Sequence, residues 1–314
     1  MHINNNIIKI SGSPEGFDAD LIIKEVNAGK TSIHVCRDDK RLLEAKQALQ
    51  FYNAGFKVLE FPAWDCLPYD RVSPSLTIVS KRISTLSKLT REQVDPFVVL
   101  TTVAAITQKT QSIKTIKETV FNLNVGKQLN IDNLMVYLVR MGFSKCSTVM
   151  EPGDYSLRGG IIDIFPPSHK KPIRLDLFGD TLETIRSFDQ NTQIGKDQVK
   201  SVTLTPASEV ILDEQGIENF RKNYRAEFGA PSSDDGVYES VTAGMKYQGL
   251  EHWLPFYYEE LANLFDYLPK ATIFLDEGFE MIVQDRWSKV LDQFDSRKEV
   301  LSRKRNLESI YKPI

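Results

Sequence analysis

The sequence has few of the residues on which most metal and nucleophilic sites depend. Its 314 residues include only three cysteines and four histidines, and Cys36, Cys66 and Cys146 lie far apart in the chain. This scarcity argues against a disulfide framework and is typical of proteins from a reducing compartment. His34 and Cys36 are two residues apart, but no further ligand follows at the spacing of a zinc site, so we interpret them as core or rim residues.

The chain also lacks an excess of charge and any long apolar run. Lysine and arginine number 39 against 42 aspartate and glutamate, a formal net charge of −3. This balance gives no overall attraction to nucleic acid or to an anionic membrane. The first residues lack the basic start and apolar run of a signal peptide, and no segment is long enough to span a membrane. The sequence therefore predicts a cytoplasmic protein without a membrane partner.

Short apolar runs that alternate with helical patterns predict an α/β protein in three blocks. Residues 1–117 are expected to form a parallel sheet with helices between its strands. Residues 118–206 begin with a helix over 131–143 and then turn to β structure. Residues 207–314 return to helices around one clear strand at 271–277. Strands of the first block are predicted at residues 6–10, 32–36, 57–61 and 97–102.

One short motif resembles a nucleotide site but lacks the residues and the order of elements that such a site requires. Gly29, Lys30 and Thr31 match the end of a phosphate-binding P-loop, whereas Lys24 stands where the first glycine of that loop is required. The segment also follows a predicted helix and precedes a strand, which reverses the order that a phosphate cradle needs. We interpret Gly29 as the end of a helix.

The position that a phosphate cradle should occupy lies earlier in the chain. There, Gly12 and Gly16 follow the predicted strand 6–10 and precede a helix, but the segment has no lysine and no suitably placed hydroxyl. Asp276 and Glu277 end the strand of the third block, as the magnesium-binding and catalytic carboxylates of many ATPases do. Without the lysine, we interpret these four residues as a degenerate nucleotide site. We expect no catalytic residue, no cofactor and no metal site.

The strand in "PIRLDLF" carries the clearest pattern in the chain. Alternation places Ile173, Leu175 and Leu177 on one face and Arg174, Asp176 and Phe178 on the other. Arginine and aromatic side chains on an exposed face are the residue types that dominate protein interfaces. Arg158, just before Gly159-Gly160, is a further candidate. Two interpretations stay open, a partner-binding surface or a solvated arginine with Phe178 packed under a neighbouring loop.

Three separated segments carry a family resemblance that covers nearly the whole chain. "DYSLRGGIIDIFP" with "PIRLDLFGDTLETIRSFD", "AWDCLPYDRVSPS" upstream and "GLEHWLPFYYEELANLFDYLPKATIFLDE" downstream resemble the N-terminal region of bacterial transcription-repair coupling factors (Mfd). That region is itself similar to the excision-repair helicase UvrB. The resemblance implies that this chain corresponds to about the N-terminal third of such a factor. Nothing in it resembles the family's RNA-polymerase-binding domain or DNA translocase motor, so contacts with RNA polymerase and DNA are expected from domains absent here.

The resemblance also implies a fold and a partner. The fold is a degenerate RecA/P-loop-like parallel domain, residues 1–117 and 207–314, split around a β-rich α+β domain at 118–206. That inserted domain would dock UvrA, and Arg158, Arg174 and Phe178 match the family's contact positions. The implied function is a non-enzymatic docking module of transcription-coupled nucleotide excision repair.

An enzymatic alternative stays open beside this reading. It is a UvrB-like ATP-dependent helicase component that processes damaged DNA, and the missing loop lysine disfavours it. UvrB inserts a tyrosine-rich hairpin into damaged DNA at the place that "PAWDCLPYDRVSPS" occupies here. This loop is short, so Trp64 and Tyr69 are interpreted as packing residues of the loop rather than as a DNA wedge.

Overall fold

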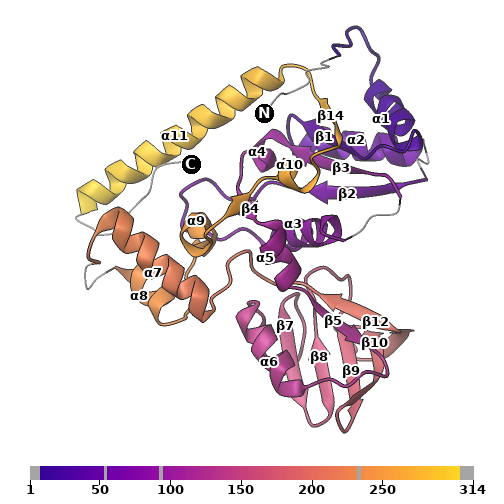
Figure 1. Ribbon diagram of the computed structural model, residues 1–314, viewed down its shortest axis with the longest axis vertical. Coiled ribbons are helices and arrows are strands. Elements are labelled where there is room, and N and C mark those ends of the chain that lie inside the picture. The colour runs from indigo at the N-terminus through magenta and orange to yellow at the C-terminus, as the bar shows by residue number, and fades with distance from the viewer. Residues whose placement is uncertain (1–7, 53–54, 92–94, 232–234, 305–314) are drawn as a thin grey trace.

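A parallel four-stranded sheet is assembled from both ends of the chain. The structure is a computed structural model that describes residues 8–52, 55–91, 95–231 and 235–304. The strand order is β14-β1-β3-β2, and all neighbours run parallel. Because β14 comes from the third block, the predicted fold class, a parallel α/β sheet split around an inserted β-rich part, is confirmed (Figure 1). The strands are β1 (Ser32–Cys36), β2 (Lys57–Phe61), β3 (Phe97–Thr102) and β14 (Thr272–Leu275).

Helices cover both faces of this sheet. On one face, α1 (Phe17–Asn27) and α2 (Asp39–Phe51) bury apolar residues at helical spacing against β1 and β3. On the other face, α3 (Leu76–Leu89) packs with α4 (Val103–Ile106) and α10 (Leu264–Tyr267). Asp38 and Ser75 cap the amino ends of α2 and α3 by accepting hydrogen bonds from backbone N–H groups, which satisfies donors that the helix itself leaves free.

The strand predicted at residues 6–10 does not form in its described part. Residues 8–10 have no β-pairing, and Ile8 and Ile10 are 82% and 52% exposed; residues 6 and 7 lie outside the described residues. The place beside β1 is taken by β14. An apolar run becomes a strand only where a neighbour pairs with its backbone groups, and the sequence pattern does not report that neighbour.

A six-stranded, mostly antiparallel sheet forms the inserted part. Its order is β11-β10-β9-β8-β7-β6, and only the β6–β7 pair is parallel. On its inner face, α6 (Ile131–Arg140) and the ribbon of β5 (Phe121–Asn124) and β12 (Ser201–Leu204) enclose a shared core. The six strands are β6 (Ser144–Lys145), β7 (Asp154–Arg158), β8 (Ile161–Ile164), β9 (Ile173–Phe178), β10 (Thr181–Phe188) and β11 (Gly195–Val199).

The rest of the chain packs beside the parallel sheet and around an aromatic cluster centred on Phe220. The last helix, α11 (Phe279–Lys304), runs along one side of the molecule (Figure 1). Within the described residues, none of the helices is both long and apolar enough to cross a membrane. The remaining elements are β4 (Thr110–Gln111), α5 (Ile113–Glu118), α7 (Glu214–Phe228), α8 (Gly236–Thr242), a 3₁₀ turn (Leu250–Trp253), α9 (Leu254–Tyr257) and β13 (Leu261–Ala262).

A buried ion pair ties α3 to the segment that leaves the inserted part. Arg82 donates from Nε to Glu209 Oε1 at 2.7 Å, and both side chains are fully buried. Arg82 also donates to the carbonyl oxygen of Pro62 and lies over the ring of Phe61. A buried ion pair of this kind fixes a geometry, because neither charge has water to replace its partner.

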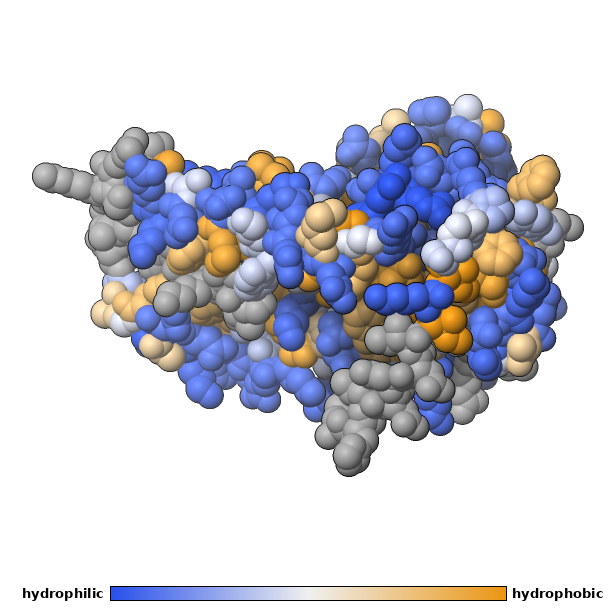
Figure 2. Space-filling model, turned by 90° about the horizontal axis from the view of Figure 1, so that it is seen from above, coloured by the Kyte–Doolittle hydropathy of each residue, from blue (hydrophilic) through white to orange (hydrophobic). Residues whose placement is uncertain are grey.

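The outer surface is mostly polar. Figure 2 shows charged and polar residues over most of the upper face, with hydrophobic residues gathered toward the side that carries α1 and β14 in Figure 1. Edge strand β14 contributes Ile273 and Leu275, which are about half exposed. Scattered exposed apolar residues are normal on protein surfaces.

Candidate partner-docking site

The β9–β10 hairpin presents Phe178 to solvent. Ile173 and Leu175 on the opposite face are 2% and 0% exposed, whereas Phe178 is 77% exposed. Gly179 begins the two-residue turn with a φ of 58°, which glycine adopts without steric cost. The predicted alternation is therefore confirmed at these positions, and the alternative in which Phe178 packs under a neighbouring loop is wrong.

Arg158 lies at the same end of the sheet as Phe178. It is directly opposite Ile161 on β8, and Ile161 is opposite Asp176 on β9. Residues directly opposite one another share a face of the sheet, so Arg158, Ile161 and Phe178 all lie on the outer face. Ile161 is 42% exposed. We call these three residues the hairpin-end surface, because they lie beside the β7–β8 and β9–β10 turns.

The charge of Arg158 is available for binding. Its side chain is exposed and makes neither an ion pair nor a hydrogen bond with any other part of the chain that the structure describes. An exposed arginine beside an exposed aromatic ring offers a partner both a cation and an apolar anchor.

Gly160 allows the backbone of Leu177 on β9 to approach closely. The Leu177 N–H donates to the Gly160 carbonyl oxygen at 3.1 Å. A Cβ atom on Gly160 would lie 3.3 Å from the carbonyl oxygen of Leu177, which is tighter than most such contacts. Gly160 therefore holds β9 against the β7–β8 turn and so fixes the hairpin-end surface.

Arg174 lies on the predicted face of β9, but it already has a partner within the sheet. Its Nε and Nη2 atoms donate to the two carboxylate oxygens of Asp163 at 2.7 and 2.8 Å. The guanidinium also lies 4.8 Å from the centre of the Phe188 ring. The hydrogen bonds to Asp163 raise the pKa of Arg174 against the opposing effect of burial. Arg174 is therefore a support for the outer face rather than a free cation on it.

Two functional features of the outer face escaped the sequence analysis. Ile161 adds apolar area beside Arg158, and Asp176 accepts a hydrogen bond from Arg186 at 2.5 Å, which joins β9 to β10. Ile162 and Ile164 are core residues. Alternation along "IIDIF" could therefore have placed Ile161 and Asp163 together on the outer face. The cross-strand pairs themselves required the register.

The degenerate nucleotide site has two glycines before α1, but they are four rather than five positions apart and the chemistry of a cradle is missing. Gly12 and Gly16 have φ values of 68° and 81°, and α1 begins directly after Gly16. If Gly16 takes the place of the second P-loop glycine, Phe17 and Asp18 stand where the lysine and the hydroxyl are required. Asp18 accepts a hydrogen bond from Arg41 at 2.5 Å. A carboxylate at this position repels a phosphate.

Asp276 is engaged within the protein. It accepts hydrogen bonds from His34 Nε2 at 3.0 Å and from the Arg37 N–H at 2.9 Å, and Arg41 Nε lies 3.7 Å away. Burial opposes ionisation of Asp276, but these groups together lower its pKa below the usual value. Glu277 is exposed. The carboxylate that would hold magnesium in an ATPase therefore has internal partners here.

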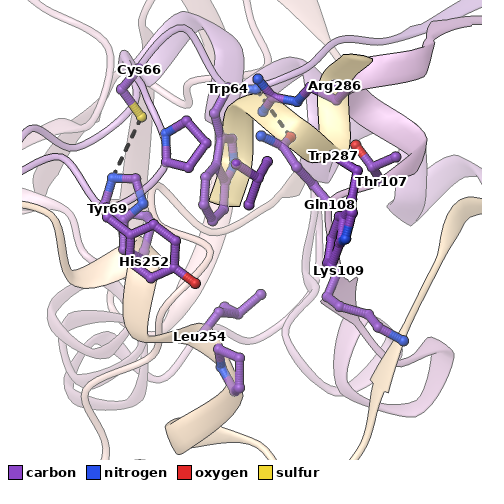
Figure 3. A pocket seen from close by; sticks show the side chains of 14 residues that line it. Trp64, Cys66, Tyr69, Thr107, Gln108, Lys109, His252, Leu254, Arg286 and Trp287 are labelled. Atoms are coloured by element: carbon purple, nitrogen blue, oxygen red, sulfur yellow. Dashed lines mark hydrogen bonds between the residues drawn. The ribbon is translucent and has the colours of Figure 1, made fainter. Parts of the chain in front are cut away.

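Trp64 and Tyr69 pack against other elements, as the sequence predicted. Trp64 Nε1 donates to Glu209 at 2.9 Å, and the Tyr69 ring packs 5.5 Å from the ring of Phe294 on α11. Trp64, Tyr69 and His252 are among the residues that line a pocket of about 130 Å³. Figure 3 shows their side chains beside it. Both aromatic residues are thus held in the loop rather than projected from it.

Comparison with known proteins defines the class of the inserted part. Residues 121–210 match the family model described as the UvrB interaction domain. This match contains all three residues of the hairpin-end surface, as well as Arg174 and Asp163.

The relatives extend the likeness to most of the chain. This chain is 36% identical to the transcription-repair-coupling factor of Haemophilus influenzae over 217 residues. The aligned residues cover 69% of this chain and 19% of that protein. The corresponding protein of Rickettsia bellii is 30% identical over 260 residues, 83% of this chain and 23% of the relative. The transcription-repair-coupling factor of Escherichia coli is 31% identical over 242 residues, which cover 76% of this chain and 21% of the relative. This chain is homologous to the N-terminal part of transcription-repair-coupling factors. It spans about a fifth of the length of these relatives, less than the third that the resemblance implied.

Proposed function

We propose that this chain is a docking module of transcription-coupled nucleotide excision repair, and that its inserted β-rich part binds UvrA. The observation that carries the proposal is the hairpin-end surface. Its Phe178 is 77% exposed beside a two-residue hairpin turn. A large aromatic side chain in that position has no role in the core of this chain, and such residues anchor protein interfaces.

The chemistry of this surface suits an acidic groove on the partner. Arg158 is exposed beside Ile161 and can pair with a carboxylate through two parallel hydrogen bonds. Arg174 would act indirectly, because its pair with Asp163 stiffens the strand that carries Phe178. A strand already fixed in its bound geometry loses little conformational entropy when a partner docks.

The experiment that tests this function is a calorimetric titration of UvrA with the chain. We expect saturable binding to one site per chain, with a negative heat-capacity change because Phe178 and Ile161 leave water. The same titration in the presence of excess isolated UvrB should be competitive if both proteins use a similar surface. Absence of saturable binding, in a UvrA preparation that binds UvrB, would contradict the proposal.

A UvrB-like ATPase is the second candidate, and Asp276 and Glu277 at the end of β14 are the features that favour it. We propose that the chain is instead non-enzymatic. Phe17 and Asp18 replace the phosphate-binding pair, and Asp276 is bonded to His34. A fluorescent nucleotide titration with magnesium present is expected to show no saturable binding. Micromolar affinity would favour the ATPase and argue against this part of the proposal.

A further inference from the structure

Three side chains with metal-ligand chemistry meet at the carboxyl edge of the parallel sheet. One donor atom each from His34, Cys36 and Asp276 lies within 4.8 Å of the other two. His34 and Cys36 are 1% and 0% exposed, and the Asp276 side chain keeps 12% exposure. A histidine, a thiol and a carboxylate converging in a buried place differ from the scattered surface carboxylates that commonly lie close together without a metal.

The split sheet creates this cluster. His34 and Cys36 lie two residues apart on one face of β1, the face covered by α1 and α2. Strand β14 runs parallel beside β1 with Leu275 opposite Val35, so Asp276 comes next to Cys36 at the strand ends. His34 and Asp276 are separated by 242 positions in the chain. The sequence therefore showed all three donors but not that they meet, and no metal site was expected from it.

The imidazole of His34 points to a missing ligand. Its Nε2 contacts Asp276, but Nδ1 is buried without a hydrogen-bond partner and lies 3.8 Å from Asp18 Oδ2. A buried ring nitrogen without a partner is destabilising. When one nitrogen of a histidine binds a metal, the other carries hydrogen and is commonly oriented by a carboxylate. Asp18 Oδ2 would have to move closer than 3.8 Å to accept that hydrogen bond.

We propose that His34, Cys36 and Asp276 bind one divalent transition-metal ion, with zinc as the best fit. Thiolate, imidazole and carboxylate are zinc ligands, and a water molecule can complete four-coordination. On binding, the Cys36 thiol releases its proton to solvent and a sulfur–metal bond forms. The His34 proton moves from Nε2 to Nδ1, so that Nε2 and Asp276 Oδ1 exchange their mutual hydrogen bond for bonds to the metal. Asp276 Oδ2 keeps its hydrogen bond from the Arg37 N–H. The thiolate, Asp276 and Asp18 carry three negative charges and Arg41 one positive charge, so a divalent ion makes the cluster neutral.

The metal would join the two separate segments of the split sheet. Two ligands belong to β1 and the third follows β14, so one ion would bridge the N-terminal and C-terminal parts of the parallel domain. Asp18 and Asp276 retain 24% and 12% side-chain exposure, which leaves a route from solvent. This role is independent of the docking of UvrA.

Cobalt(II) is the probe that tests the site, because a cobalt–thiolate bond gives a charge-transfer absorption band. We expect one cobalt per chain with this band, displaced by zinc. The band should vanish in Cys36→Ser and His34→Gln. It should remain in Cys146→Ser and in Cys66→Ser, a matched control because Cys66 Sγ lies 3.7 Å from His252 Nε2, another close cysteine–histidine pair.

Folding is controlled separately, since Cys36 and His34 are buried. Circular dichroism of each variant tests whether it is folded. Asp276 is the more exposed ligand, and Asp276→Asn is expected to weaken zinc binding at least about tenfold, measured in competition with a chromophoric chelator. At one zinc concentration, the melting temperature of the unmodified chain should rise more than that of Asp276→Asn. No thiolate band in the folded chain, or a band that survives Cys36→Ser or is lost in Cys66→Ser, would overturn the proposal.

Discussion

Arg174 on β9 lies directly opposite Asp163 on β8 and holds both of its carboxylate oxygens, at 2.7 and 2.8 Å. Asp163 is only 2% exposed, so its negative charge depends on this partner. A residue that we propose to act in UvrA docking thus supports the sheet from which Phe178 projects. Loss of Arg174 should therefore affect stability and binding together.

The first prediction concerns this pair. Arg174→Ala is expected to lower the free energy of unfolding by about 2 kcal/mol, less than for a fully buried pair because Arg174 is partly exposed. Urea denaturation measures this loss. Asp163→Ala/Arg174→Ala should be less destabilised than the sum of the two single variants, because the second change removes a charge already unpaired. Unchanged stability of Arg174→Ala would show that the pair contributes nothing.

Arg158 should behave in the opposite way. Arg158→Glu is expected to leave the free energy of unfolding unchanged, because the side chain is exposed and unpaired among the residues that the structure describes. UvrA affinity should fall by about thirtyfold, since a reversed charge would repel an acidic groove. Stopped-flow association gives the rate, which should slow most at low salt. Arg221→Glu on α7 makes the same charge change elsewhere and should bind UvrA normally. An equal loss of affinity in both variants would show that the net charge of the chain, rather than Arg158, controls binding.

The Arg82–Glu209 pair should dominate the stability of the junction beside the inserted part. Both side chains are fully buried, so Glu209→Ala leaves a buried cation and is expected to cost about 3–5 kcal/mol. Thermal denaturation measures it. The double variant Arg82→Met/Glu209→Leu, which removes both charges, should recover part of that loss. A double variant less stable than Glu209→Ala would mean that shape rather than charge determines the stability here.

Much of the fold follows from local pattern. Alternation predicted the faces of β9, and the Gly179-Asp180 pair at the turn after β9 is itself typical of a hairpin. Helix α3 begins and ends where its periodicity does, Leu76–Leu89. These features depend on residues within a few positions of one another. The strand predicted at residues 6–10 failed in its described part because strand formation also depends on a distant neighbour.

The site was only partly predictable for the same reason. Exposure of Phe178 follows from period-2 alternation, whereas the partner of Arg174 follows from the β8–β9 register, which no single strand encodes. Likewise, Asp276 could be placed at a strand end but not beside His34, because their contact depends on β14 pairing with β1. Cross-strand chemistry becomes visible only when the order and register of the strands are known.

The most direct test of the docking account is the UvrA affinity of Phe178→Ala, measured together with its melting temperature. Phe178 is 77% exposed, so the melting temperature should hardly change. Affinity should fall by about thirtyfold, the loss of roughly 2 kcal/mol typical of an aromatic hot spot. Phe51→Ala, at an 85% exposed phenylalanine on α2, is the matched control and should bind UvrA normally. Unchanged affinity in folded Phe178→Ala would contradict the account.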